Sequence, residues 1–152
     1  MTATPPALPA TGEVLSVVGE QIRILADGAM TGGKFLVFEE SGPPGGGPPL
    51  HRHDRDDEFF TILEGAMKFV VDGVTRVVGP GDTMFAPKGS VHTFVNVGST
   101  RHRMLVVCCP AGLEGPFRAC DAMEREGRVT PEAVTAAFRA FDLHIVGPPL
   151  TP

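Results

Sequence analysis

The feature that most constrains the fold is a series of short apolar runs, each bounded by residues that favour turns. The runs are rich in β-branched and aromatic side chains, which favours strands over helices. The chain also contains 19 glycines and 15 prolines, an enrichment that short strands joined by many tight turns require. We therefore predict an all-β fold, either a barrel or a sandwich. The expected strands span residues 14–18, 22–26, 35–38, 59–63, 67–71, 75–78, 83–86, 91–97 and 104–109.

The last third of the chain changes to a helical pattern. Thr130 precedes Pro131, which is the arrangement of a capping residue followed by proline at the first helical position. Alanine, valine and phenylalanine side chains then recur at helical spacing. We predict one helix at about residues 131–141 and a second, shorter helix at about residues 114–126.

Composition argues against several classes of function. The net charge is −5 and no basic stripe is present, which disfavours nucleic acid as a partner. A hydrophobic content of 42% with 20% charged residues is typical of a soluble domain, so no membrane partner is expected. Residues 1–10 lack the basic start and apolar core of a signal peptide. Three cysteines, two of them adjacent, argue against a disulfide framework and indicate a reducing cytoplasm.

Three histidines and one glutamate fall in two segments with the spacing of a metal site. In the first segment, His51 and His53 are two residues apart, so on a strand both project from one face. Glu58 follows after the charged residues 54–57, which suit a turn. We predict that a hairpin at this turn brings the Glu58 carboxylate back beside the two imidazoles.

The second segment supplies one further histidine. A turn at residues 87–89 precedes His92, which is expected at the start of another strand. Imidazole nitrogens with one carboxylate oxygen suit a divalent transition metal rather than calcium or magnesium. Four protein ligands would leave coordination positions open for a substrate or dioxygen.

The two segments together resemble the two motifs of the cupin family at every fixed position. The first reads G-x5-H-x-H-x4-E-x6-G from Gly45 to Gly65, and the second reads G-x5-P-x-G-x2-H-x3-N from Gly81 to Asn96. The resemblance implies a double-stranded β-helix, or jelly-roll, barrel that holds one metal ion per chain, which could be iron, manganese, nickel, cobalt, copper or zinc. The implied ligands are His51, His53, Glu58 and His92.

The resemblance also implies a domain layout and a subgroup. Residues 13–112 would form the cupin β-barrel, with residues 1–12 as a flexible N-terminal arm and residues 113–152 as a helical extension packed on the barrel. Residues 43–50, 110–114 and 146–150 look like the corresponding parts of small single-domain cupins related to quercetinases. This subgroup resemblance is less specific than the metal motifs.

Strand alternation predicts the side chains that line a substrate pocket beside the metal. If Lys68, Arg101 and Arg103 face solvent, their neighbours on the same strands face inward. The predicted lining is mainly apolar, which suits a flat aromatic or other hydrophobic small molecule better than a phosphorylated sugar. The predicted lining residues are Phe60, Ile62, Met67, Phe69, Phe94, His102 and Met104.

The resemblance to quercetinases implies a dioxygenase. Glu58 would either complete the coordination of the metal as a ligand or, as a mobile base, take a proton from a flavonol or related enol. The ring of that substrate would then be cleaved with dioxygen. The same ligand set also suits an oxygen-independent isomerase, lyase or cyclase acting on a polyketide-like or sugar-like substrate. A non-catalytic cupin that binds a small molecule is a third alternative, because fold alone does not fix function. Family resemblance, and sheet edges that need cover, further predict a homodimer.

Overall fold

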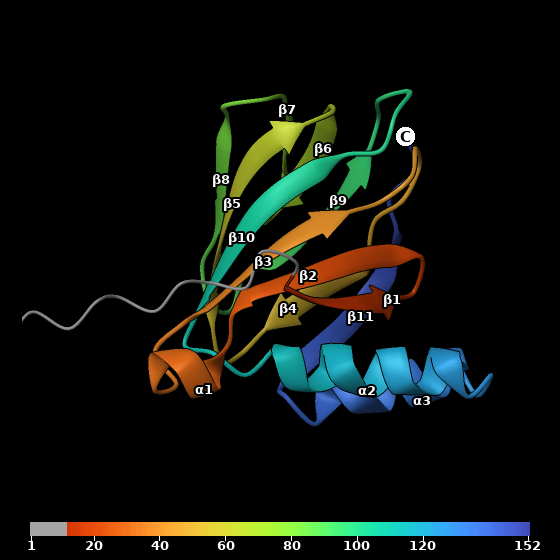
Figure 1. Ribbon diagram of the computed structural model, residues 1–152. Coiled ribbons are helices and arrows are strands. Elements are labelled where there is room, and N and C mark those ends of the chain that lie inside the picture. The colour runs from red at the N-terminus through yellow and green to blue at the C-terminus, as the bar shows by residue number, and fades with distance from the viewer. Residues whose placement is uncertain (1–11) are drawn as a thin grey trace, which may run out of the picture.

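The computed structural model describes residues 12–152 and contains two antiparallel sheets (Figure 1). The first sheet has the strand order β1-β2-β3-β10-β5-β8 and the second has the order β11-β4-β9-β6-β7. The all-β prediction is therefore confirmed, and the arrangement is that of a jelly-roll barrel. The first sheet contains β1 (Glu13–Val17), β2 (Glu20–Ala26), β3 (Leu36–Ser41), β5 (Asp57–Glu64), β8 (Thr83–Ala86) and β10 (Arg103–Cys109). The second contains β4 (Pro49–His53), β6 (Met67–Val71), β7 (Val74–Val78), β9 (Val91–Asn96) and β11 (Leu143–Pro149).

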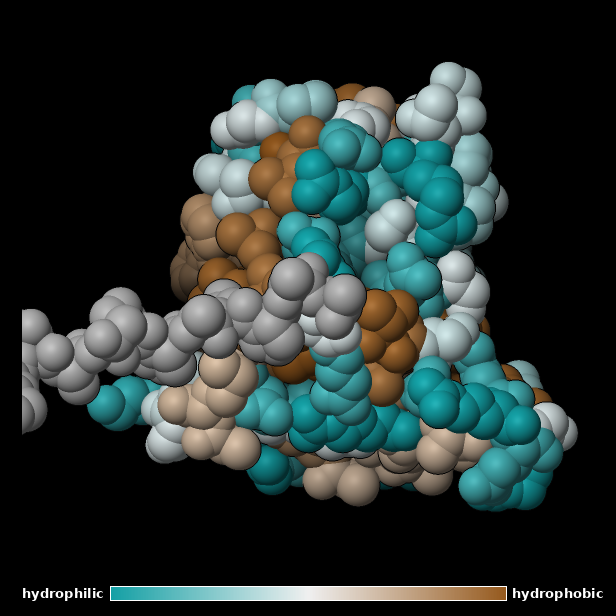
Figure 2. All heavy atoms as spheres, viewed as in Figure 1, coloured by the Kyte–Doolittle hydropathy of each residue, from teal (hydrophilic) through white to brown (hydrophobic). Residues whose placement is uncertain are grey.

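The core lies between the inner faces of the two sheets, while the outer surface in Figure 2 carries hydrophilic residues with hydrophobic patches between them. Buried and more exposed residues alternate along β3 and along β10, as expected for strands with one face toward a core. Phe60 of β5 and Phe69 and Phe94 of the opposite sheet meet here with ring centroids 5.0–5.8 Å apart. These aromatic contacts hold the sheets together at one part of the barrel and leave another part for the site described below.

Three helices are present in the described residues: α1 (Gly28–Thr31), α2 (Glu114–Arg125) and α3 (Pro131–Arg139). The two predicted helices correspond to α2 and α3. The Thr130 side chain accepts a hydrogen bond from the Ala133 amide at 3.1 Å, as the capping pattern predicts. In Figure 1, α2 and α3 lie side by side across one end of the barrel, beside β1 and β11. None of the three helices is long and apolar enough to cross a membrane.

The end of the chain differs from the predicted helical extension. Residues 113–152 contain α2 and α3, but β11 then returns to the barrel and pairs with β4. The sequence signal was weak because Gly147-Pro148-Pro149 is a poor strand pattern. Proline is tolerated here because β11 is the edge of its sheet and its pairing is irregular between Ile145 and Pro149. The predicted N-terminal arm lies outside the described residues, apart from Gly12.

Candidate metal centre

The four predicted ligands come from three strands and meet inside the barrel. His51 and His53 lie on β4 and His92 lies on β9, where His92 is the register partner of His51. Glu58 lies on β5 of the opposite sheet. The predicted hairpin between His53 and Glu58 is therefore wrong, because the turn after β4 carries the chain from one sheet to the other. The carboxylate reaches the imidazoles by facing them across the barrel.

The donor atoms of these residues converge closely. The Glu58 Oε2 atom lies 3.1 Å from His92 Nε2 and 3.4 Å from His53 Nε2. The three imidazole centroids are 4.5–5.1 Å apart, and the potential ligand atoms of all four residues lie within 4.8 Å of one another. All four side chains are buried. The cluster could thus hold one metal ion with three nitrogen donors and one oxygen donor, a set that suits a divalent transition metal.

Hydrogen bonds at the far side of each ring orient the histidines. The Nδ1 atom lies 2.7 Å from the Pro49 carbonyl oxygen in His51 and 3.2 Å from the Ser90 carbonyl oxygen in His92. Because a carbonyl only accepts, each Nδ1 carries the proton and each Nε2 presents its lone pair to the cluster. This is the arrangement that metal-binding histidines adopt.

Asp56 accepts the hydrogen bond that orients the His53 ring. The sequence did not predict this role of Asp56. The His53 Nδ1 atom lies 3.0 Å and 3.1 Å from the two Asp56 carboxylate oxygens, and Asp56 is 1% exposed. The charged residues 54–57 read as a turn in the sequence, a pattern that gives Asp56 no role in the site. The only signal was an aspartate three residues after a candidate histidine, and its neighbours Asp54 and Asp57 are exposed.

Replacing Asp56 with asparagine is expected to weaken metal binding about 10- to 100-fold, the usual effect of losing a carboxylate behind a metal-binding histidine. The amide keeps the size of the side chain but removes the charge that orients and polarises His53. Competition with a chelator measures the change in affinity. Asp54→Asn is the matched control, because Asp54 pairs with Arg52 and His144 outside the cluster. Equal affinities for Asp56→Asn and wild type would rule out this role.

The cluster is electrostatically suited to a cation. Burial, assisted by the neighbouring imidazoles, lowers the pKa of His51 to about 3, so this ring is neutral. Burial alone would raise the pKa of Glu58, but the surrounding histidines outweigh it and lower the pKa to about 2. Burial likewise opposes a charge on His53, yet Glu58 and Asp56 raise its pKa. The ionised carboxylate can therefore serve as a ligand or as a proton acceptor at neutral pH.

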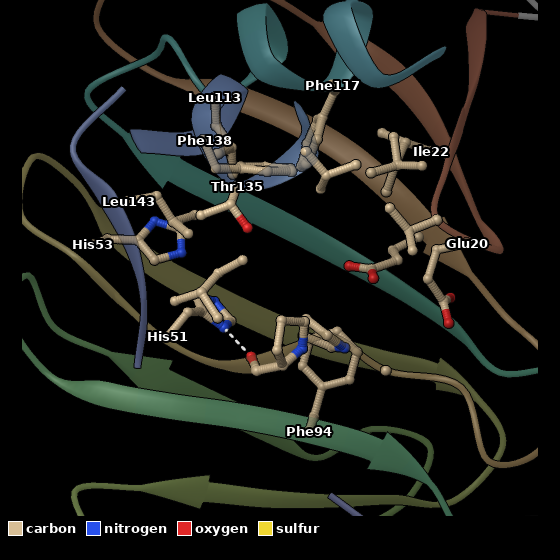
Figure 3. Close-up of a pocket in the computed structure, with 18 of the residues that line it drawn as sticks. Glu20, Ile22, His51, His53, Phe94, Leu113, Phe117, Thr135, Phe138 and Leu143 are labelled. Atoms are coloured by element: carbon tan, nitrogen blue, oxygen red, sulfur yellow. Dashed lines mark hydrogen bonds between the residues drawn. The ribbon is translucent and has the colours of Figure 1, made fainter. Parts of the chain in front are cut away.

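The cluster opens into a cavity of about 430 Å³ (Figure 3), a volume within the usual range for small-molecule sites. The wall is formed mainly by apolar side chains from both sheets and from α2 and α3, and none of its described residues is a lysine or arginine. Figure 3 shows His51 and His53 on one side, Phe94 below, and Phe117, Leu113 and Phe138 above.

The cavity wall differs from the predicted one. Of the predicted lining residues, Phe94 alone lies on the cavity. The other six point inward as expected but are packed in the barrel with at most 1% exposure. Strand alternation separates inward from outward side chains, but it does not show which part of the interior is filled. The six residues that do not line the cavity are Phe60, Ile62, Met67, Phe69, His102 and Met104.

The comparisons with known proteins agree with this fold. A family model described as a cupin domain matches residues 38–108. The chain is 30% identical over 141 residues to quercetin 2,3-dioxygenase of Bacillus subtilis (strain 168), covering 87% of the chain but 41% of that relative. It is 31% identical over 88 residues to an oxalate-binding protein of Thermotoga maritima, covering 58% of the chain and 73% of the relative. The chain thus spans less than half the length of the dioxygenase that it matches.

A solved structure gives a further comparison at the level of the fold and sequence. The structure of the polyketide cyclase RemF from Streptomyces resistomycificus superimposes with a TM-score of 0.60 at 28% identity, covering 70% of this chain and 79% of that one. Similar proteins therefore carry several different activities on one barrel.

Proposed function

The chain belongs to the cupin superfamily, and from that premise we propose that it is a metal-dependent dioxygenase that cleaves a flavonol or a related aromatic, enolic small molecule. The observation that carries the proposal is that the cluster of His51, His53, Glu58 and His92 opens into a mainly apolar cavity whose described lining contains no lysine or arginine. Similarity to quercetin 2,3-dioxygenase along most of this chain supports the choice of reaction.

Within this proposal, the protein binds and orients the substrate and moves one proton. A divalent transition metal held by the four ligands would supply Lewis acidity and open coordination positions for the substrate and dioxygen. The Glu58 carboxylate, ionised and buried, accepts the proton of the enolic hydroxyl. The aromatic side chains Phe94, Phe117 and Phe138 flank the cavity, pack against a flat ring system and exclude water from the site.

A second candidate function is oxygen-independent chemistry on a similar substrate. The likeness to a polyketide cyclase favours this alternative, because a metal that polarises an enol can promote cyclisation as well as oxidation. Non-catalytic binding is the third candidate, and similarity to an oxalate-binding protein supports it. The homodimer and the cytoplasmic location stay predictions, which light scattering and cell fractionation would test.

Oxygen uptake separates these candidates. The purified protein is reconstituted separately with iron, manganese, cobalt, nickel, copper or zinc, and dioxygen is followed after quercetin is added. We expect uptake with at least one metal, together with loss of the flavonol absorbance, and none with metal-free protein. Substrate loss without oxygen uptake would support the oxygen-independent alternative. Binding of quercetin with neither change would support a binding protein and contradict the dioxygenase.

A further inference from the structure

A second cluster of buried ionisable residues lies in the same barrel, away from the histidine cluster. Glu20 begins β2, Glu40 lies on β3, and His102 precedes β10. The strands β2, β3 and β10 are neighbours in the first sheet, which places the three side chains together on its inner face. Their potential ligand atoms lie within 4.8 Å of one another. Glu20 and Glu40 are each 8% exposed and His102 is fully buried.

Glu20 and His102 contain buried polar atoms that have no hydrogen-bond partner in the described part of the chain. Glu20 Oε2 and both ring nitrogens of His102 make no hydrogen bond within the described residues, although most buried polar atoms are paired. His102 Nε2 lies 3.6 Å from Glu20 Oε2, which is too long for a hydrogen bond. It is comparable to the spacing of two ligand atoms that share an ion about 2.1 Å from each.

In the described part of the chain, neither carboxylate forms an ion pair with a lysine or arginine side chain. Among residues 12–152, no lysine or arginine lies within ion-pair distance of Glu20 or Glu40. The positive charge of Arg101 acts to lower the pKa of Glu20. The Arg101 guanidinium, however, donates its hydrogen bond to the Ser41 carbonyl oxygen, at 3.0 Å. The charge of two buried carboxylates therefore needs another source of compensation.

The loop after β3 packs closely against the Glu20 carboxylate. At Gly42 and at Gly46, a Cβ atom would overlap the Glu20 carboxylate. Glycine at these two positions allows the loop after β3 to pass close to the carboxylate. Glu20 and Glu40 also line the cavity, and Figure 3 shows Glu20 on the side opposite His53. An ion or molecule in the cavity can thus reach the cluster.

We propose that Glu20, Glu40 and His102 form a second binding site for a divalent transition metal ion, across the cavity from the histidine cluster. Two carboxylate oxygens and one imidazole nitrogen are suitable donors for manganese, iron, cobalt or zinc. The ion would neutralise both carboxylates and give unpaired atoms of Glu20 and His102 a partner. This site is independent of the proposed dioxygenase reaction.

The acid–base properties of the three groups agree with such a site. Burial raises the pKa of Glu20 to about 7, against the opposing influence of Arg101, and burial also raises the pKa of Glu40 well above its usual range. Burial lowers the pKa of His102 to about 4, so its imidazole is neutral and able to ligate. A bound cation would replace the protons that otherwise neutralise the carboxylates.

Metal stoichiometry tests the proposal. Wild-type protein is dialysed to equilibrium against Mn²⁺ or Zn²⁺, and the number of metal ions bound per chain is measured by elemental mass spectrometry. We expect two ions per chain in wild type and one in the double variant Glu20→Gln, Glu40→Gln. His92→Ala, which disables the first cluster, should also retain one ion, and the combination should retain none. Glu39→Gln is the matched control, because Glu39 neighbours Glu40 but bonds to Arg23 and Arg103 instead.

Two results would overturn the proposal: one ion in wild type that His92→Ala removes, or two ions in the double glutamine variant. Circular dichroism verifies that each variant is folded, and His102→Gln replaces the double variant if that protein does not fold. The outcome is separable from the proposed function. Two bound ions without oxygen uptake would contradict the dioxygenase alone, whereas oxygen uptake with a single bound ion would contradict the second site alone.

Discussion

Replacing His92 with alanine is expected to lower metal affinity at the histidine cluster by more than about 100-fold. Losing a residue that only supports a metal ligand costs about 10- to 100-fold, and His92 itself presents Nε2 to the cluster, 3.1 Å from Glu58. The substitution removes one of three nitrogen donors and also the shorter of the two contacts between an imidazole and Glu58 Oε2. Metal-dependent activity should fall with metal occupancy.

Two measurements check this expectation. A chelator competition gives the affinity, and thermal unfolding gives an independent reading, because an ion that binds the folded state raises the melting temperature. The comparison is made in the double variant Glu20→Gln, Glu40→Gln, so that only the histidine cluster binds metal. Metal should raise the melting temperature of this double variant, but not that of the same protein with His92→Ala. His144→Ala is the matched control, since His144 contacts Asp54 at the surface and not the cluster. Unchanged affinity in His92→Ala would remove His92 from the ligand set.

The ligand cluster could be predicted from sequence because its signals are local and rigid. A spacing of two on a strand fixes the common face of His51 and His53, and a turn before His92 fixes the start of its strand. The position of Glu58 was predicted for the wrong reason, because a hairpin and a crossing between sheets both return the carboxylate to the same place. Sequence spacing does not distinguish these two paths.

The cavity could not be predicted because it depends on contacts between distant segments. Leu113 and Phe117 of the α2 region and Val134 and Phe138 of α3 form much of its wall, and nothing in the strand pattern indicates where these helices dock. The cluster that contains Glu20 and Glu40 could not be predicted for the same reason. Each reads as an ordinary polar residue in its own strand, and their proximity arises only when β2 and β3 pair.

Replacing Glu58 with glutamine is expected to lower turnover strongly while leaving appreciable metal binding. Glu58→Gln keeps the size of the side chain and one oxygen that can act as a ligand, while removing the charge that accepts a proton. The three histidines remain, so we expect appreciable metal binding. Turnover should fall by about 100- to 10,000-fold, the usual contribution of a positioned general base. The low pKa of Glu58, about 2, means that wild type carries the ionised base throughout the neutral range.

Steady-state oxygen uptake per bound metal ion separates the two roles of Glu58. The rate is divided by the metal bound at the histidine cluster, which is the total bound metal less the amount that His92→Ala retains. This removes any effect of lower occupancy, and the remaining loss reports proton transfer. Glu64→Gln is the control, because Glu64 ends the same strand and pairs with Arg103 at the surface. If Glu58→Gln bound metal normally and turned over normally, the base role would be wrong. If the variant had a normal rate per bound ion but a low metal content, Glu58 would be a ligand only. Loss of a base lowers the rate of the metal-loaded protein, whereas loss of a ligand lowers the amount of metal-loaded protein.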